Sequence, residues 1–545
     1  MKKLVLGVIA VVGLALPCYG QDYYTQGERE YWLQKAEENI PELTETIKLP
    51  KGVVRIVKDD RAYQGWKVEP VSPMQQFYQT SLKAQESFIL DFGEHITGYF
   101  SFSVSPLNRT PDAPSRIKFT FGEVPSEMMT PFDPYKGSLS RAWLQDEIVT
   151  VMTAPDTVAI PRRLAFRYVK VELYHAPNYD FAISDMFCKA VTSASSQPEP
   201  LSPAAPEIIK EIDRVGLNTL KECMQTVYED GPKRDQRLWI GDLYLEALAN
   251  AYSYRRHDLT KRCLYLLAGL ADESGFLNSA VFERPYPHPQ AKQLLLDYAL
   301  LFNASVKEYL DATGDKETAE DLWKVVKKQI DIAPLYMQDN GLMDFGKTSK
   351  DWWIFVDWRD VLHKEVALQG ITIFGLRQTY ELAKLLGREK ELSHVPKQIK
   401  QMTDAARKHF YDKKTGLFAG LENKQISYSS QLWMILAGVT SKAEAQRALK
   451  ALNTTENVVH TATPYAYHYY IQALLDCGLN EEAREALIDF WGGMVKKGAD
   501  TFWEAYDPEN DYISPYNFFP MNSYSHAWSC TPVYFIRKYP EIFQK

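Results

Sequence analysis

The chain has 545 residues, of which 45% are hydrophobic and 24% charged, a composition that is ordinary for a globular protein. This length allows several domains, at about 100 to 200 residues each. The formal net charge of −8 argues against nucleic acid as a partner. The six cysteines lie far apart in the sequence. They predict neither a disulfide framework nor a zinc site, and no metal or other cofactor is expected.

Residues 1–20 are predicted to form a secretory signal peptide. Met1-Lys-Lys precedes an apolar run from Leu4 to Leu16, and we expect cleavage after Gly20. This predicts a secreted or periplasmic protein. A lipoprotein anchored at Cys18 is the less favoured alternative, because Pro17 stands directly before that cysteine. No later segment has 18 uninterrupted apolar residues, so no membrane span is expected.

The next part of the chain shows the alternation of β-strands. Apolar residues Ile117, Phe119 and Phe121 alternate with polar ones, and similar runs recur from residue 46 to residue 191. Short alternating strands with turn residues between them are typical of a β-sandwich, which we place at residues 21–195. A proline-rich linker follows at residues 196–206.

From residue 207 to residue 545 the period becomes 3.6, which indicates helices. Eleven patterns follow a first helix near residues 209–227, at about 242–255, 259–271, 291–313, 316–337, 362–387, 391–411, 427–438, 442–452, 463–477, 480–497 and 523–538. About 12 helices fit six hairpins closed into an (α/α)6 barrel. An α-solenoid is disfavoured because the sequence shows no fixed repeat of about 20 to 50 residues.

The stretch from residue 230 to residue 242 is the first candidate for a site. It holds three carboxylates, three basic groups and one tryptophan within 13 residues. Gly231-Pro232 ends one predicted helix, and Gly241-Asp242 opens the next. The charges are thus expected on a short loop between two helices, where a rigid scaffold often carries function.

Five further loops combine aromatic with ionisable residues, at 282–289, 351–360, 461–470, 501–506 and 522–528. Any one of them could be ordinary aromatic core packing. Together, in one barrel, they favour a sugar as ligand, because aromatic faces stack on apolar C–H groups and carboxylates or guanidinium groups bind hydroxyls. A carbohydrate is therefore the expected partner, and the oligomeric state is left open.

These motifs resemble those of the bacterial α-L-rhamnosidases, which are inverting glycosidases with an (α/α)6 barrel. The family motif Asp-x-Pro-x-Arg-Asp-Glu, followed by Trp and Gly-Asp, is similar to the segment from Asp230 to Asp242. A Thr-x-Trp-Glu motif matches residues 501–504, and residues 525–528 resemble a late histidine motif. The resemblance also reaches the sandwich, through residues 89–98 and 166–169, and implies a rhamnose site that includes Asp230, Arg234, Asp235, Gln236, Trp239, Asp242, Asp357, Trp358, Glu504 and His526.

Two departures from the family bear on the chemistry. The family's general acid is the Glu of Arg-Asp-Glu, and Gln236 stands in its place. The spacing to the tryptophan is also one residue shorter. An inverting glycosidase needs one carboxylic acid and one carboxylate, about 6.5–9.5 Å apart. Glu504 matches the base, whereas an amide at residue 236 cannot supply the acid.

Three explanations follow. In the favoured one, the enzyme is an L-rhamnose-α-1,4-D-glucuronate lyase that removes the rhamnose caps of plant arabinogalactan by β-elimination, and it resembles the rhamnose–glucuronate lyases, for which a tyrosine base is proposed. In the second, Asp235 or Asp242 has become the acid and the protein is an inverting α-L-rhamnosidase. In the third, the chain is a rhamnose-binding protein without catalysis.

The lyase hypothesis assigns its own catalytic residues. An arginine must neutralise the uronate carboxylate, and Arg234, Arg237, Arg284 and Arg359 are available in the loops. A tyrosine beside such a cation could act as base. Tyr286, two residues from Arg284, is the first candidate, and Tyr467 and Tyr524 are the alternates. Glu504 would then only hold the rhamnose.

Overall fold

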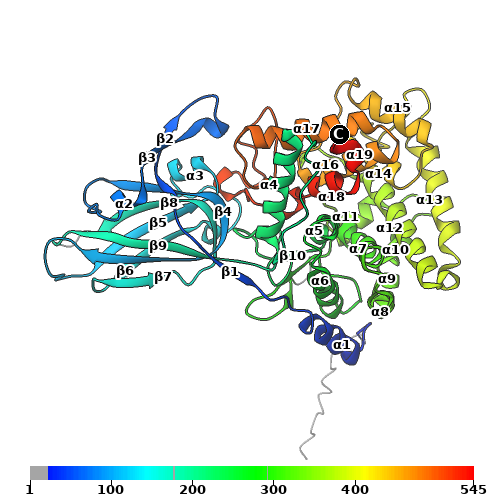
Figure 1. Ribbon diagram of the computed structural model, residues 1–545. Helices are drawn as coiled ribbons and strands as arrows, with labels where there is room; N and C mark the ends of the chain where they lie inside the picture. Colours follow the sequence, from blue (N-terminus) through cyan, green and yellow to red (C-terminus); the bar gives the residue numbers. More distant parts are fainter. Residues whose placement is uncertain (1–21, 176–177, 291–292) are drawn as a thin grey trace, which may run out of the picture.

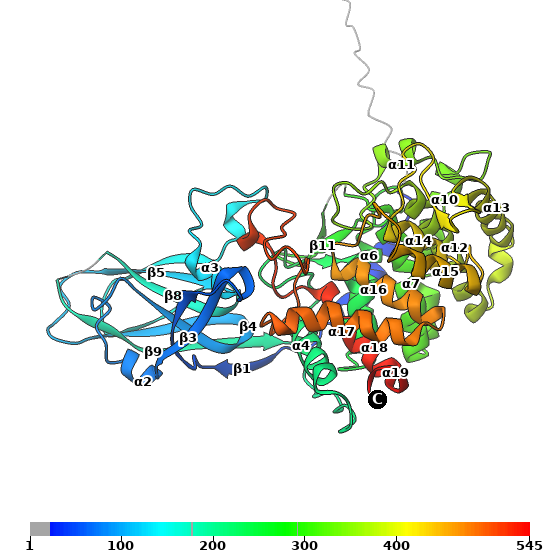
Figure 2. The ribbon, with the colours of Figure 1, turned by 90° about the horizontal axis from the view of Figure 1, so that it is seen from above.

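The computed structural model describes residues 22–175, 178–290 and 293–545 and has a sheet-rich and a helical domain (Figure 1). The predicted signal peptide and Cys18 lie outside the described residues. Seen from above, the two domains lie side by side, and loops of both meet between them (Figure 2). Among the described helices, none is long and apolar enough to cross a membrane.

The sheet-rich domain is organised by the long strand β4 (Ser87–Pro106). Its first half pairs with β8 and its second half with β9, with a register shift between Asp91 and Ile96, so the sheet curls around one core. The alternation seen in the sequence places Phe119 and Phe121 inside this core. The strand order is β1-β9-β4-β8-β5-β6, with β2, β3 and β7 on side branches: β1 (Thr44–Lys48), β2 (Gly52–Lys58), β3 (Trp66–Ser72), β5 (Ser115–Gly122), β6 (Asp146–Val151), β7 (Asp156–Ala159), β8 (Leu164–His175) and β9 (Phe181–Thr192).

The first helix, α1 (Gln26–Glu37), precedes the sheet in sequence but packs against the helical domain. Thr25 and Glu28 form a capping box that fixes its start. Arg29 donates to the carbonyls of Ala271 at 2.5 Å and Asp272 at 2.8 Å. The helical domain therefore includes a segment from before the sheet as well as residues after 206.

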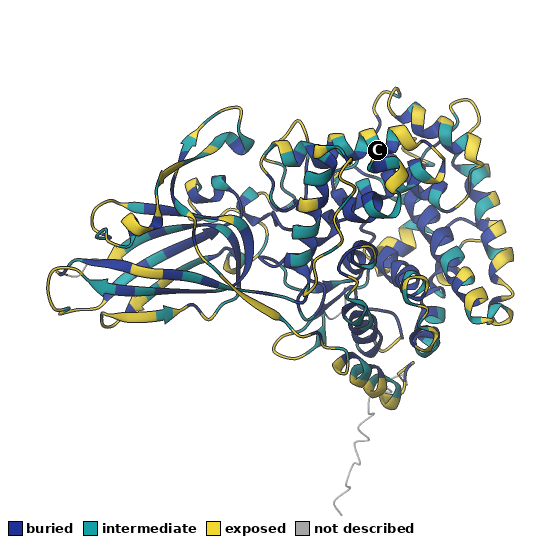
Figure 3. Cartoon of the chain, in the orientation of Figure 1, coloured by how far each residue is buried: buried dark blue, intermediate teal, exposed yellow. Residues whose placement is uncertain are grey.

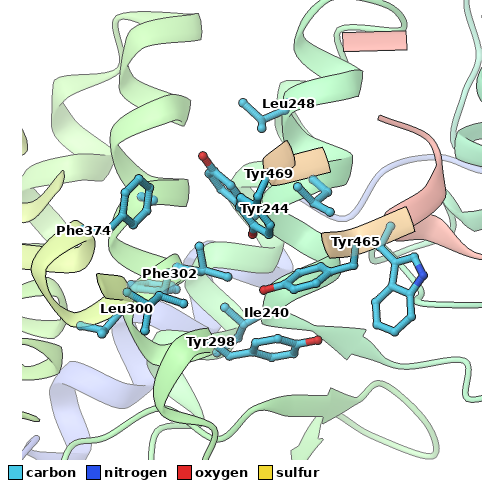
Figure 4. Packing of buried hydrophobic residues seen from close by; sticks show 14 of the residues in the cluster. Ile240, Tyr244, Leu248, Tyr298, Leu300, Phe302, Phe374, Tyr465 and Tyr469 are labelled. Atoms are coloured by element: carbon cyan, nitrogen blue, oxygen red, sulfur yellow. The ribbon is translucent and has the colours of Figure 1, made fainter. Parts of the chain in front are cut away.

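The helical domain has one continuous core formed by the facing sides of its helices (Figures 3 and 4). Tyr244, Tyr298, Phe374 and Tyr469 meet there from four different helices (Figure 4). Contacts run from α5 to α7, α12, α14 and α16, and return to α5 through α18 and the turn before it. The main helices are α4 (Glu207–Cys223), α5 (Ile240–Ala251), α6 (His257–Gly269), α7 (Leu296–Thr313), α12 (Glu365–Leu386), α13 (Val395–His409), α14 (Tyr428–Leu436), α15 (Lys442–Leu452), α16 (Pro464–Asp476), α17 (Asn480–Lys496) and α18 (Pro532–Lys538).

Two helix predictions need correction. The pattern at 316–337 is divided into α8 (Lys316–Asp321), α9 (Trp323–Gln329) and α10 (Ile332–Tyr336). The helix expected at 523–538 begins only at Pro532. The preceding residues form bends and a short 3-10 turn at Ala527–Ser529 instead of an α-helix. The backbone of Ser523 is used to hold Glu504: the two residues exchange hydrogen bonds of 2.9 and 3.0 Å.

Candidate active site

A pocket lies in the helical domain where residues from distant parts of the chain meet. Acids, one arginine, one histidine and many aromatic rings form its wall. The lining residues are Asp230, Arg234, Asp235, Trp239, Asp242, Leu295, Tyr298, Trp353, Phe355, Trp358, Glu504, Tyr516, His526 and Trp528.

Asp230 stabilises the conformation of the loop between α4 and α5. Its buried carboxylate accepts hydrogen bonds from the backbone N–H groups of Asp235, at 3.2 Å, and Arg237, also at 3.2 Å. Its own backbone N–H donates to the Arg237 carbonyl at 3.0 Å. These bonds close the loop on itself and turn Arg234 and Asp235 toward the pocket.

Arg234 and Glu504 form the buried centre of the site. One terminal nitrogen of the guanidinium donates to Glu504, and the other lies 3.2 Å from Asp235. Its Nε donates to the Met521 carbonyl at 3.0 Å. The Tyr516 hydroxyl also donates to Glu504, and the guanidinium lies 4.3 Å from the Tyr516 ring centre. Arg234 is thus fixed on every side, and it holds Glu504 in one orientation.

The surroundings shift the pKa values of the carboxyls in the pocket in opposite directions. Burial alone would raise the pKa of Glu504, but the charges of Arg234 and His526 outweigh it and lower that pKa. Burial raises the pKa of Asp242, and the nearby charge of Glu504 adds to the rise. Burial and the charge of Asp235 likewise raise the pKa of Asp230. Glu504 therefore loses its proton more readily than an ordinary glutamic acid, while Asp242 and Asp230 hold theirs more tightly than an ordinary aspartic acid.

His526 lies near both Glu504, whose pKa is lowered, and Asp242, whose pKa is raised. Its Nε2 is 3.4 Å from Asp242 Oδ1, and its ring packs on Trp528 at 4.2 Å between centres. Burial would lower the pKa of His526, but the charges of Glu504 and Asp242 outweigh it and raise that pKa. A protonated His526 can hold the anionic form of Asp242 after a proton leaves it.

An aromatic wall closes the other side of the pocket. Phe355 packs between Trp358, at 4.9 Å, and Trp528, at 5.6 Å between ring centres. The wall is set by buried Asp297, which accepts from the backbone N–H groups of Phe355 at 3.2 Å and Val356 at 2.9 Å. Val356 has φ of 58°, which is strained for a β-branched residue. The hydrogen bonds to Asp297 therefore stabilise a strained backbone turn, which places the rings of Phe355 and Trp358 in the pocket wall.

Several polar atoms in the wall are buried but make no hydrogen bond of normal geometry within the described residues. The 3.4 Å contact between His526 and Asp242 is not counted as one. They include the indole Nε1 atoms of Trp239 and Trp358, Oδ1 of Asp242 and both ring nitrogens of His526. Buried polar groups are normally hydrogen-bonded. Donors and acceptors that converge on one pocket fit a ligand with several hydroxyl groups.

Eight of the predicted site residues line this pocket, although they come from distant parts of the sequence. They are Asp230, Arg234, Asp235, Trp239, Asp242, Trp358, Glu504 and His526.

The two residues that were assigned to β-elimination alone do not line it. The Tyr286 side chain is 68% exposed, on the turn between β11 (Ala280–Phe282) and β12 (His288–Pro289). Arg284 is exposed and lies 3.4 Å from the Tyr99 hydroxyl of the sheet-rich domain. Three prolines stiffen this hairpin. Tyr286 and Arg284 lie outside the described pocket, which does not support their assignment as base and cation.

The alternate bases also lie elsewhere. Tyr467 stacks on Phe490 at 3.9 Å on the outer side of α16. Tyr524 is buried and its hydroxyl accepts from Gln64 at 2.9 Å, in the wall between the two domains. Burial raises the pKa of both phenols, which opposes a role as base.

Two predicted substrate contacts have structural roles instead. Asp357 is buried and accepts from Ala462 N at 2.8 Å and Thr463 Oγ1 at 2.7 Å, so it joins two loops. Burial raises the pKa of Asp357 to about 6. Gln236 turns away from the pocket, because its φ is 58° and its side-chain amide donates to the Pro232 carbonyl at 2.7 Å.

Six lining residues were not among the predicted site residues: Leu295, Tyr298, Trp353, Phe355, Tyr516 and Trp528. Trp353, Phe355 and Trp528 lie in the loops at 351–360 and 522–528 that the sequence singled out, whereas the other three lie outside the candidate loops. Leu295 and Tyr298 begin α7, and their apolar character gave no signal beyond core packing. Tyr516 lies in a stretch rich in tyrosine and phenylalanine at 512–519, the same kind of signal that identified the other loops. Within the described residues, no group of three or more potential ligands could hold a metal ion.

A helical domain with a small pocket of opposed carboxyls, a fixed arginine and an aromatic wall defines the class of carbohydrate-active enzymes. The family model for the N-terminal domain of glycosyl hydrolase family 78 α-rhamnosidases matches residues 50–190. The model for the bacterial α-L-rhamnosidase six-hairpin glycosidase domain matches residues 204–539. The chain belongs to this α-L-rhamnosidase family.

Solved structures agree with this membership. A rhamnosidase from Klebsiella oxytoca with rhamnose bound is 39% identical, with a TM-score of 0.90 over 94% of this chain and 99% of that one. The family 78 rhamnosidase of Bacillus sp. GL1 is 19% identical, with a TM-score of 0.72 over 86% of this chain and 49% of its own. A Streptomyces avermitilis α-L-rhamnosidase complexed with L-rhamnose is 16% identical, with a TM-score of 0.64 over 91% and 44%. The two distant likenesses concern the fold alone. No curated protein matches the chain significantly in sequence.

Proposed function

We propose that the protein is an inverting α-L-rhamnosidase that hydrolyses terminal L-rhamnose from a glycan. The observation that carries this is that one pocket holds two carboxyls whose pKa values are shifted in opposite directions, downward for Glu504 and upward for Asp242. Two titratable groups whose pKa values are pushed apart by their surroundings are the pattern of an acid and a base. The 39% identical relative, which has rhamnose bound, supports rhamnose as the sugar.

In this reaction Glu504 is the general base. A water between Glu504 and the sugar loses its proton to the carboxylate and attacks the anomeric carbon. The hydrogen bonds from Arg234, Tyr516 and Ser523 hold the carboxylate toward one face of the sugar. The aromatic wall around Phe355 and Trp358 offers the apolar surface on which a rhamnose ring and its methyl group can pack.

Asp242 is the proposed general acid, in place of the Glu that Gln236 replaces. It gives its proton to the glycosidic oxygen as the bond to the anomeric carbon breaks, and His526 then stabilises the resulting anion. Asp235 is the less suitable acid, because its two carboxylate oxygens are already paired with the guanidinium groups of Arg234 at 3.2 Å and Arg237 at 3.6 Å.

The ring of contacts from α5 through α7, α12, α14 and α16 back to α5 supports the (α/α)6 arrangement for the helical domain. The likeness of residues 50–190 to the family's N-terminal domain, together with the curled sheet, supports a β-sandwich before it. Export by the predicted signal peptide, giving a secreted or periplasmic enzyme, is part of the same proposal and rests on residues 1–20 of the sequence.

The residues that were assigned to elimination alone, Tyr286 and Arg284, lie outside the described pocket. Burial raises the pKa of Tyr298 and Tyr516, the two tyrosines that line it, which opposes a role as base. Arg234, the remaining cation, is already engaged by Glu504. These observations favour hydrolysis.

The test is to incubate the enzyme with rhamnose-capped glycans, including a glucuronate-linked one, and follow the products by NMR and ultraviolet absorbance. Free L-rhamnose that first appears as the inverted anomer, without an absorbing unsaturated uronate, is the expected result. A rise in absorbance coupled to rhamnose release would identify elimination instead. Binding of rhamnose without any release would identify a binding protein.

A further inference from the structure

Glu123, at the end of β5 in the sheet-rich domain, has no exposed side-chain surface and lies directly behind the pocket wall. Its Oε1 lies 2.9 Å from His95 Nε2. Its Oε2 takes two bonds from the helical domain, from Lys233 Nζ at 2.8 Å and from the backbone N–H of Tyr524 at 2.7 Å. One carboxylate oxygen of the sheet-rich domain thus joins two separate loops of the other domain.

In each of these loops, the residue next to the one that contacts Glu123 donates a hydrogen bond to Glu504. Lys233 precedes Arg234, whose guanidinium donates to Glu504. Tyr524 follows Ser523, whose backbone N–H donates to Glu504 Oε2 at 3.0 Å. These two donors to Glu504 Oε2 are therefore each adjacent in sequence to a residue that contacts Glu123.

The ammonium group of Lys233 has no freedom to move. It contacts Glu123, Glu127 at 3.0 Å and the Pro520 carbonyl at 3.3 Å, so each of its three hydrogens has a partner. Its side chain is 3% exposed. Glu127 is held in turn, since its Oε2 accepts from the backbone N–H groups of Glu123 at 2.6 Å and Val124 at 3.1 Å.

We propose that Glu123 is a positioning residue for the reaction and that, through Lys233 and Tyr524, it sets the place of Arg234 and Ser523 against Glu504. The role of the base rests on the proposed function. The sheet-rich domain then takes part in catalysis by fixing the geometry of the base, although none of its side chains lines the pocket.

A buried ion pair of this kind need not add net stability, because both charges lose their hydration. Removing only one partner of the pair, however, leaves the charge of the other partner uncompensated in the protein interior. In Lys233→Met, Glu123 and Glu127 lose their common cation and repel each other, so the loop that carries Arg234 is expected to move. Catalysis is sensitive to displacements of about 1 Å, which can cost roughly 100-fold in rate.

The experiment compares wild type with Glu123→Gln and Lys233→Met in the full chain. We expect kcat for rhamnose release to fall about 10- to 100-fold, with a smaller change in the affinity for free L-rhamnose. The acidic limb of the kcat profile should move to higher pH, because a displaced Arg234 no longer lowers the pKa of Glu504. Hydrogen exchange in residues 230–240 and 522–526 should become faster.

Asp213→Asn is the matched control. Asp213 pairs with Arg537 at 2.8 Å, and the two side chains are also largely buried, at 6% and 9% exposed. This pair joins α4 to α18 away from the pocket, so the variant should lower the melting temperature while kcat and the pH profile stay as in wild type. A loss of activity in Glu123→Gln that only follows the loss of stability, as in the control, would overturn the proposal.

The proposal and the proposed function fail in different ways. A wild-type enzyme that releases no rhamnose would refute the function, and hydrogen exchange of the two loops would still test the connection through Glu123. Unchanged exchange and unchanged kcat in Lys233→Met would refute the positioning role in an active rhamnosidase. The positioning role would also be refuted if Glu123→Gln folds stably, keeps the kcat of wild type and shows no shift in the acidic limb of its kcat–pH profile.

Discussion

Arg234 and Glu504, 270 residues apart in the chain, form a buried ion pair at the centre of the pocket. The guanidinium also contacts Asp235 and the Met521 carbonyl, so it connects the loop before α5 to the last loops of the helical domain. This pairing lowers the pKa of Glu504 and fixes its direction. An anionic, oriented carboxylate is what a general base requires.

The first prediction concerns Glu504 itself. Glu504→Gln keeps the size of the side chain but cannot accept the proton of the attacking water, so kcat for rhamnose release should fall about 100- to 10,000-fold. Tyr516→Phe removes one hydrogen bond to the same carboxylate and keeps the base, so its loss should be much smaller. Both are measured as rates of L-rhamnose release, with binding of free rhamnose as a check on the fold. Near-wild-type release by Glu504→Gln would exclude Glu504 as the base.

The second prediction separates the two candidate acids. Asp242→Asn should slow substrates with poor, alkoxide leaving groups strongly, and an aryl rhamnoside with an acidic phenol much less, because a good leaving group needs little protonation. Asp235→Asn should slow both kinds of substrate to a similar degree, since Asp235 contacts Arg234 at 3.2 Å and has no role in protonating the leaving group in the proposed mechanism. The comparison is made as kcat/KM ratios between the two substrates. Leaving-group dependence in Asp235→Asn, and not in Asp242→Asn, would transfer the acid role to Asp235.

The third prediction follows from His95, which is buried between the domains and faces Glu123, Glu222 and Asp500. Burial would lower its pKa, but the bonds and charges of Glu123 and Glu222 raise the pKa of His95 to about 9. A histidine whose pKa is raised on folding contributes stability that is complete below its unfolded pKa of about 6.5. That contribution, at most about 3 kcal/mol, is lost as the pH rises through about 9.

The measurement for this prediction is the free energy of unfolding from urea titrations between pH 6 and pH 10. Wild type should lose more stability over this range than His95→Gln, which has no proton to release there. The difference between the two proteins removes the effect of lysines and tyrosines that titrate at the upper end. Parallel curves for wild type and variant would show that His95 is not charged in the folded protein.

The elements of the fold could be predicted where one period dominates. Ile117, Phe119 and Phe121 alternate without interruption, and they form a buried strand. The prediction of a helix over all of 523–538 was wrong because a local pattern contains no information about tertiary contacts. The backbone N–H of Ser523 donates to Glu504, and this residue does not join a helix. The docking of α1 on the helical domain likewise depends on contacts such as Arg29 with Ala271, which no local pattern records.

The site was predictable where a motif fixes the spacing of charged residues, as from Asp230 to Asp242. It was not predictable where only residue type was available. With 33 tyrosines in the chain, the choice of Tyr286 rested on its distance from Arg284 in sequence, and the hairpin that carries both points outward. Tyr516 was missed because its role depends on the three-dimensional approach to Glu504.

The last prediction concerns the position at which the family has its acid. Gln236→Glu restores the family residue in sequence but not its place in the pocket. The side chain of residue 236 points to the Pro232 carbonyl, from a backbone with φ of 58°. A new carboxylate there would meet a carbonyl oxygen and no donor, so it would turn toward solvent or disturb the loop.

We therefore expect Gln236→Glu to hydrolyse rhamnosides no faster than wild type and to melt at a slightly lower temperature, because it loses one hydrogen bond worth about 1 kcal/mol. Gln236→Ala, which loses the same bond without adding a charge, is the matched control and should behave similarly. The decisive protein is the double variant Asp242→Asn with Gln236→Glu. If residue 236 cannot reach the glycosidic oxygen, the added glutamate will not restore the rate lost in Asp242→Asn. Recovery of a large part of the about 100- to 10,000-fold general-acid contribution would instead show that the loop can bring residue 236 into the pocket.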